Sequence, residues 1–137
     1  MRNGFAILSE EDIETIRKCP KIRCWNVISE YNLSEEFIRE FQDYFDWFYI
    51  SYYQELSEDC IRKCKHNLHW ALASYYQKLS ENFIREFQDK VKWDNISCRQ
   101  ILSKEFISEF SNKICFHSLL NNKFISDEVK EFCRMFI

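Results

Sequence analysis

The sequence predicts an all-α fold, an α-solenoid of stacked short helical hairpins with a 23-residue repeat. The segment "LSEEFIREFQDYFDWFYIS" at 33–51 returns nearly unchanged as "LSENFIREFQDKVKWDNIS" at 79–97. The chain has a single glycine, Gly4, and a single proline, Pro20, among its 137 residues. Because these residues are the strongest breakers of regular structure, their absence after Pro20 favours helices over hairpins with tight turns.

Three series of residues fix the period of the repeat. Each series advances by 23 residues per step, a regularity that is hard to obtain by chance. The Leu-Ser series runs through Leu33, Leu56, Leu79, Leu102 and Ile125. The tryptophan series runs through Trp47, Trp70, Trp93 and Phe116, and the glutamine series through Gln54, Gln77 and Gln100. A chain repeats itself in this way when each segment is a supersecondary unit that buries its apolar face by stacking on neighbouring copies.

We expect one domain over 1–137, because 137 residues with 46% hydrophobic content form one sizeable core and are too few for two ordinary ones. The repeats are an irregular N-terminal unit at 8–32, regular units at 33–55, 56–78, 79–101 and 102–124, and a terminal helix at 125–137. The irregular unit carries extra residues around Cys19-Pro20, where a loop is expected.

The first helix of the unit at 33–55 is predicted over about 34–45. Its apolar residues follow the one-sided stripe of an amphipathic helix. Ser34 is a good N-cap, and Glu35 and Glu36 place negative charge in the first turn, where the helix dipole favours it. Equivalent serines begin the first helices of three other units, at Ser57, Ser80 and Ser103.

The second helix is predicted over about 47–54, because Trp47, Ile50, Ser51 and Gln54 fit one helical face and Asp46 can cap it. Five hairpins of this kind and a last helix at the C-terminal end make roughly eleven helices in all. Helices this short are unstable alone, so their order must come from neighbouring units.

Composition argues against several classes of function. A formal charge of −3 on a mixed surface lacks the basic stripe that binds phosphate backbones, so we expect no nucleic-acid partner. The apolar run at 5–8 is too short for a secretory signal, and no later run approaches a membrane span. We therefore expect a cytoplasmic protein without membrane contact, whose seven cysteines are reduced thiols.

Units such as "WDNIS", followed by a glutamine and then "LSENFIREFQDKV", resemble the short α-helical repeat arrays encoded by large DNA viruses of protists and by some phages. The resemblance covers 33 to about 126 and, loosely, the N-terminal unit. It implies an interaction scaffold acting in the cytoplasm of a host cell. The third unit departs from the pattern, because "CIRKCKHNLHWALAS" replaces "FIREFQDKVKWDNIS" there.

Cys60, Cys64, His66 and His69 form the one cluster that looks like a metal site. The two cysteines occupy places that phenylalanines hold in other units, and buried thiols are ordinary core residues. His66 aligns with aspartates on the outer face, and structural zinc needs four converging ligands. We therefore expect no metal, no cofactor and no catalytic residue; the alternative is a zinc-binding or thiol-dependent enzyme centred on Cys60, Cys64 and His69.

An excess of aromatic residues is the most informative surface signal. When the core face is removed from "WFYISYY" at 47–53, four aromatic rings remain on the other side of the helix, and soluble monomers seldom expose such clusters without a partner. The opposing interpretation is that consecutive second helices bury these rings against each other. The expected partner-binding residues are Tyr31, Phe48, Tyr49, Tyr52, Tyr53, Tyr75, Tyr76 and Arg99.

Repeated pairs of opposite charge four residues apart predict a solvated outer face on the first helices, at Glu35 and Arg39, Glu58 and Arg62, and Glu81 and Arg85. The arginines could instead bind an acidic partner.

The function expected from these observations is a non-enzymatic protein-protein interaction scaffold, a viral or phage factor that engages a host or defence protein, for instance as an inhibitor. A second alternative is a self-associating repeat protein. The chain ends in "EFCRMFI" without a polar capping helix, whereas terminal repeats normally carry a polar outer face. That alternative predicts a homodimer through the C-terminal helix at 125–137.

Overall fold

The computed structural model describes residues 6–137. The regular elements in that part are eleven α-helices and two short 3-10 helices, and no strand occurs among them. The predicted all-α fold of short helical hairpins is confirmed. None of the described helices is long and apolar enough to cross a membrane.

The chain divides into two compact units, Met1–His69 and Trp70–Ile137, with the division inside the third repeat. The first unit contains α1 (Glu10–Lys18), η1 (Pro20–Ile22), α2 (Trp25–Ile28), α3 (Glu35–Glu40), α4 (Trp47–Tyr53) and α5 (Glu58–Cys64). The second contains α6 (Trp70–Tyr76), α7 (Glu81–Glu86), α8 (Trp93–Arg99), α9 (Lys104–Glu109), α10 (Phe116–Leu120), α11 (Asp127–Cys133) and η2 (Arg134–Phe136). The expectation of a single domain stays a prediction.

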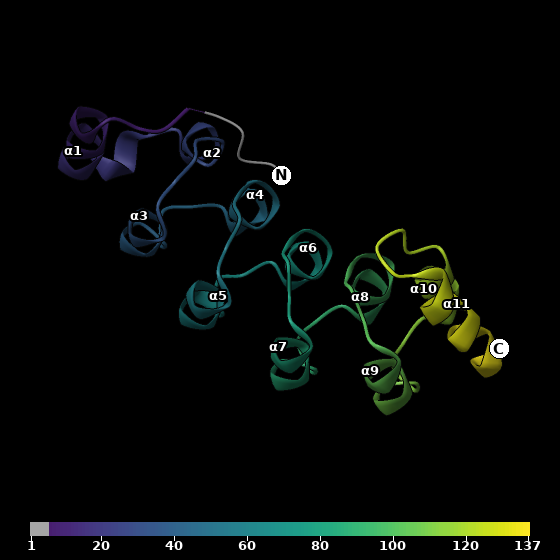
Figure 1. The fold of residues 1–137 in the computed structure, drawn as a ribbon. Helices are drawn as coiled ribbons and strands as arrows, with labels where there is room; N and C mark the ends of the chain where they lie inside the picture. Colours follow the sequence, from purple (N-terminus) through teal and green to yellow (C-terminus); the bar gives the residue numbers. More distant parts are fainter. Residues whose placement is uncertain (1–5) are drawn as a thin grey trace. The chain divides into compact units, whose positions relative to one another are not determined.

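Each unit is a solenoid segment in which first and second helices form separate rows (Figure 1). In the first unit α2 and α4 lie in one row, and α3 packs beside α5 in the other. In the second unit α6, α8 and α10 pack side by side, while α7 and α9 form the facing row and α11 contacts both α9 and α10. The irregular loop expected around Cys19-Pro20 is the 3-10 helix η1.

The predicted serine caps are confirmed. In each of the four predicted cases, and also at Ser9 and Ser126, the serine hydroxyl accepts a hydrogen bond from the backbone N–H three residues later. The Asp46 side chain caps α4 by accepting from the N–H of Phe48 at 3.0 Å. These caps satisfy N–H groups that have no partner inside the helix.

The first helices are shorter than the sequence predicts. In the unit at 33–55 the helix ends at Glu40, and Phe41 leaves the helical region with φ −109° and ψ 22°. The chain then turns, and the Trp47 indole N–H takes the Gln42 carbonyl at 2.8 Å. Because the Gln42 side chain also donates to the carbonyl of Arg39 at 3.1 Å, local side chains occupy acceptors that a longer helix would use.

Aromatic rings fill the interior of each unit. Trp25 lies 5.3 Å from Phe41 in the first unit, and Trp93 lies 5.1 Å from Phe110 in the second, between ring centroids. The second-unit phenylalanines Phe83 and Phe106 have no exposed surface. Such contacts contribute both buried apolar area and ring-ring attraction, so they supply most of the packing energy of the hairpins.

A buried glutamine joins consecutive repeats in the second unit. Gln100, 4% exposed, donates through its side-chain amide to the carbonyls of Ser74 at 2.9 Å and Gln77 at 2.7 Å. Its side-chain oxygen accepts from the N–H of Leu79 at 3.0 Å. Since the last carbonyls of a helix have no partner within it, Gln100 closes the C-terminal end of α6 from the following repeat.

The same arrangement recurs at both ends of the array. In the first unit Gln54 donates to the carbonyls of Ser29 at 2.8 Å and Tyr31 at 2.6 Å. In the last hairpin the shorter Asn122, 1% exposed, donates to the carbonyls of Ser97 at 3.0 Å and Gln100 at 2.8 Å. We call this set of buried side chains, Gln54, Gln100 and Asn122, the amide ladder.

Buried serines also join consecutive repeats, but here the side chain belongs to the earlier repeat and the backbone group to the later one. The Ser74 hydroxyl donates to the carbonyl of Trp70 at 2.7 Å within α6 and accepts from the N–H of Lys92 at 2.9 Å. Ser97 accepts in the same way from the N–H of Cys115 at 3.0 Å. Lys92 and Cys115 are the N-cap residues of α8 and α10 and make no side-chain cap, and the preceding repeat binds their own backbone N–H groups.

Replacing Gln100 with leucine tests the amide ladder. The substitution leaves two carbonyls and one N–H buried without partners, and each such group costs about 1–3 kcal/mol. We expect Gln100→Leu to lower the free energy of unfolding by about 3 kcal/mol or more, measured by urea denaturation. The matched control is Gln88→Leu at a half-buried glutamine, which donates to the Arg85 carbonyl and accepts from the Lys113 ammonium, and we expect a loss below about 1 kcal/mol. Equal losses in the two variants would contradict the role given to the ladder.

Candidate functional site

The face of α4 opposite the core carries aromatic side chains. Ile50 and Ser51 have no exposed surface, whereas Phe48 keeps 47% of its surface exposed. The three tyrosines of the helix are half-buried. The predicted separation of the aromatic residues from the core face of this helix is therefore confirmed.

These rings contact one another and form what we call the α4 aromatic cluster, made of Phe48, Tyr49, Tyr52, Tyr53 and His69. Phe48 packs edge to face against Tyr49 at 5.4 Å and against His69 at 5.6 Å, between ring centroids. Tyr49 and Tyr53 lie nearly parallel at 6.3 Å, and Tyr52 meets Tyr53 at 4.9 Å. The half-exposed rings are thus held in fixed positions by each other.

A second group, which we call the Arg99 cluster, lies in the second unit and consists of Tyr75, Tyr76, Arg99 and Phe124. Tyr75 and Tyr76 pack edge to face at 4.7 Å on α6. The Arg99 guanidinium carbon lies 4.5 Å from the ring centroid of Tyr75 and 5.0 Å from that of Phe124. Both distances are within the range of cation-π attraction. Because the two clusters belong to different units, a continuous aromatic patch stays a prediction.

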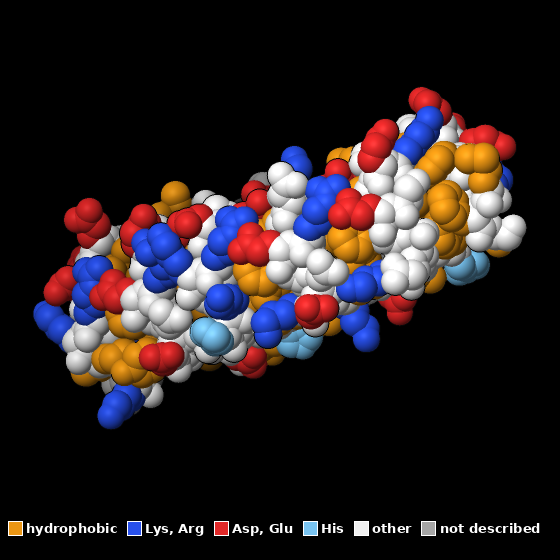
Figure 2. Space-filling model, turned by 90° about the horizontal axis from the view of Figure 1, so that it is seen from below, with side chains coloured by type: hydrophobic (Ala, Val, Ile, Leu, Met, Phe, Trp, Pro, Cys, Tyr) orange, Lys and Arg blue, Asp and Glu red, His pale blue; other side chains and the backbone are white. Residues whose placement is uncertain are grey.

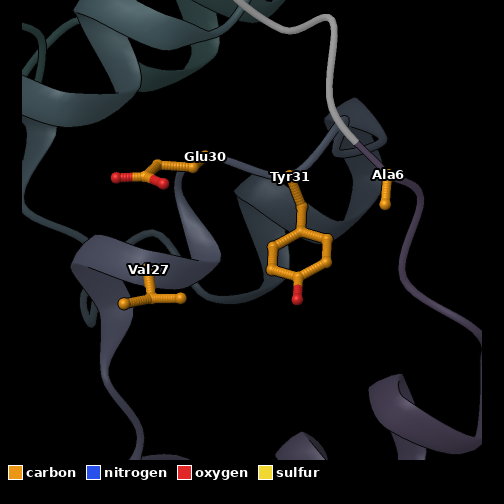
Figure 3. A pocket seen from close by; sticks show the side chains of 4 residues that line it. All are labelled: Ala6, Val27, Glu30 and Tyr31. Carbon is orange, nitrogen blue, oxygen red and sulfur yellow. The ribbon is translucent and has the colours of Figure 1, made fainter.

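Tyr31 lies in other surroundings. Its half-buried ring lines a shallow pocket of about 260 Å³ together with Val27 and Glu30 from the end of α2 and Ala6 from the segment before α1 (Figure 3). Val27 is 52% exposed, so the pocket has an apolar wall open to solvent. Among the described residues, Tyr31 makes no ring contact with the α4 aromatic cluster, and its place in a shared binding surface stays a prediction.

Phe124 belongs to the Arg99 cluster, and the sequence prediction missed it. It is 44% exposed and lies one repeat after Ile101, which is also exposed. The 23-residue spacing could have found this position, but its residue type varies between repeats, so no aromatic series marks it.

Ion pairs join neighbouring first helices. Arg17 donates to Glu40 on α3 at 2.7 Å, and Arg85 pairs with Glu109 on α9 at 2.8 Å. The hydrogen bond from Arg17 holds the pKa of the Glu40 carboxyl below its usual range. Figure 2 shows Lys and Arg side chains beside Asp and Glu side chains on the face that it displays.

The predicted pairing of Glu81 with Arg85 within one helix is not what the structure shows, since each uses the following repeat. Glu81 accepts from the N–H of Ser103 at 2.5 Å, while Arg85 reaches Glu109. Glu35 does the same as Glu81, accepting from Ser57 at 2.7 Å. Carboxylates at a helix start thus reach the cap of the next first helix, which a pattern within one helix does not predict.

The cysteines of the third repeat lie in the interior, as the alignment predicts. Cys60 and Cys64 are each 1% exposed, and Cys133 in the same series has no exposed surface. Burial raises the pKa of the Cys60 thiol to about 12 and also raises the pKa of Cys64, so neither is a thiolate at neutral pH. His69 packs against Phe48, and the described residues contain no group of three or more His, Cys, Asp and Glu side chains placed to hold a metal.

The C-terminal end of the chain packs on its own last hairpin. Phe136 of η2 stacks on Phe116 of α10 at 5.0 Å with an 11° angle between the rings, and it also contacts Phe132. Met135 and Ile137 remain 73% and 78% exposed. Association of two copies through this end stays a prediction.

No protein-family model, no curated protein and no solved structure matches this chain.

Thiol accessibility tests the placement of the cysteines. Cys19 and Cys24 are exposed, whereas Cys60, Cys64 and Cys133 are buried in their neutral form. We expect Ellman's reagent at neutral pH to modify the two exposed thiols first and the three buried ones only on unfolding, with all seven reacting in denaturant. Rapid modification of Cys60 in the folded chain, located by mass spectrometry, would contradict this core.

Proposed function

We propose that this protein is a non-enzymatic protein-protein interaction scaffold that binds an elongated segment of its partner through the aromatic face of its second helices. The observation that carries the proposal is the α4 aromatic cluster, in which Phe48 is 47% exposed and its neighbouring tyrosines are half-buried. Contiguous exposed aromatic surface on a soluble protein is typical of an interaction site.

The chemistry of tyrosine fits such a role. A tyrosine has an apolar body and a polar tip, so it can stand in water and still anchor an interface. Tyr49 and Tyr53 are stacked in parallel at 6.3 Å before any partner arrives. Because their conformations are restricted by this contact, binding costs less side-chain entropy than it would for isolated rings.

Two further elements of the proposal rest on the sequence pattern. The resemblance to viral and phage repeat arrays makes the partner a host or defence protein and the site of action the host cytoplasm. The scaffold is preferred over a thiol enzyme at Cys60 and Cys64 because burial keeps both thiols neutral.

The double variant Phe48→Ala/Tyr49→Ala tests the proposal. The partner is first recovered from the native cell with a photo-cross-linking residue at position 48 of the otherwise unchanged chain. With the purified pair, we expect calorimetry to show binding weakened by about 2 kcal/mol or more, the scale of interface hot spots. The melting temperature should change little, because these side chains are on the solvent side of α4.

Tyr44 supplies a matched control. It is also an exposed aromatic residue, at 37%, but it stacks on Trp25 at 5.4 Å in the turn after α3 rather than in the α4 aromatic cluster. We expect Tyr44→Ala to leave partner affinity unchanged. Unchanged affinity in Phe48→Ala/Tyr49→Ala, or an equal loss in Tyr44→Ala, would refute binding through the cluster.

A further inference from the structure

The Arg99 cluster places one guanidinium over two aromatic rings. Tyr75 comes from α6, Arg99 from the end of α8, and Phe124 from the segment after α10. Arg99 stands one repeat after Tyr76, so an arginine takes the place of a tyrosine at this step of the aromatic series. The cation thus stands where the two preceding repeats present tyrosine rings.

The amide ladder fixes one wall of this cluster. The Asn122 side-chain oxygen accepts from the N–H of Phe124 at 2.8 Å, while its amide donates to buried carbonyls of the preceding repeat. The backbone that carries Phe124 is therefore anchored to the interior although the ring itself is 44% exposed. The guanidinium of Arg99 therefore contacts a ring whose backbone is held in place by Asn122.

Arg99 differs from the paired cations of the second unit. Arg85 and Lys104 pair with Glu109 and Glu128, whereas within the described residues no carboxylate oxygen lies within 4.0 Å of the Arg99 guanidinium. Asp94, the acidic residue of α8, lies five positions earlier and so about 140° around the helix. Lys123 adds a second positive charge, with its ammonium 5.3 Å from the Phe124 ring centroid.

We propose that Arg99, flanked by Tyr75 and Phe124 and assisted by Lys123, binds a side-chain carboxylate in an acidic segment of the protein partner. This proposal rests on the function proposed above and specifies the chemistry of the partner. A guanidinium is planar and presents paired N–H donors in a fork that matches both oxygens of a carboxylate. The guanidinium lies within cation-π range of both rings, and no carboxylate occupies its N–H donors in the described part of the chain.

Charge complementarity favours an acidic peptide over a nucleic acid. The site offers two cations, and the chain carries a formal charge of −3, so no extended basic surface is present to follow a phosphate backbone. A base could nevertheless stack on an exposed ring beside an arginine. A short oligonucleotide therefore belongs in the test as a competing ligand.

The test follows the Arg99 Nε–H signal by NMR in the whole chain during titration with an acetylated tetrapeptide amide of alternating aspartate and glutamate. We expect a saturable shift with a Kd below about 1 mM, and no shift with the matched asparagine-glutamine peptide. Arg99→Lys keeps the charge but loses the fork, so we expect binding of the acidic peptide, followed by backbone amide shifts, to weaken about tenfold or more.

Arg85→Lys is the control, because Arg85 already has Glu109 as its partner, and it should leave peptide affinity unchanged. Phe124→Ala should weaken binding severalfold by removing one wall. The proposal is overturned by an absent shift, by equal affinity in Arg99→Lys, or by a thymidine oligonucleotide that binds Arg99 more tightly than the peptide. If Phe48→Ala/Tyr49→Ala loses partner binding and Arg99→Lys keeps it, only the carboxylate site at Arg99 is contradicted. If Arg99→Lys loses partner binding and the double variant keeps it, binding through the α4 aromatic cluster is contradicted.

Discussion

The repeats of this protein complete one another's helices through buried polar side chains. A second helix of seven residues leaves several terminal carbonyls without partners, and burying them unpaired would cost more than the hairpin could recover. Gln100 reaches two carbonyls of the preceding repeat and one N–H of its own repeat at once. A side-chain amide suits this position because it has two donors and an acceptor on one rigid group.

This constraint explains why such short helices are arranged so regularly. The amide ladder closes the C-terminal end of one second helix, and the buried serine binds the backbone N–H of the residue that precedes the next. Within the second unit, a hairpin therefore depends on its neighbours for hydrogen bonds as well as for aromatic packing. The solvent side of the second helices takes no part in these bonds, which leaves that surface available to vary and to carry the α4 aromatic cluster and the Arg99 cluster.

Much of this fold was predictable because the period and the helix pattern are both written in the sequence. The serine caps and the burial of Cys60 and Cys64 follow from alignment of the repeats, and the cap at Asp46 follows from its place directly before α4. The early end of α3 at Glu40 was not predictable from apolar spacing, because the turn that follows keeps Phe45 in the core just as a longer helix would. The competing hydrogen bonds of Gln42 and Trp47 determine where α3 ends.

The candidate site was predictable in part. Helical arithmetic found the rings of α4, but the wall that Phe124 provides for Arg99 depends on a change in the ladder. In the last hairpin Asn122 replaces the glutamine one position early and binds the N–H of Phe124. A pattern that counts only 23-residue steps misses such a shift, since lysine stands where glutamine is expected.

Amide hydrogen exchange measured by NMR tests the central claim most directly. Leu79, Lys92 and Cys115 lie outside the α-helices. The N–H groups of Lys92 and Cys115 donate to serines of the preceding repeat, and that of Leu79 donates to Gln100, whose side chain also binds carbonyls of the preceding repeat. If the repeats cap one another, these three amides exchange as slowly as amides inside α8, through opening of the whole unit. Exchange at the rate of an unstructured peptide would show that the buried side chains do not hold the repeats together.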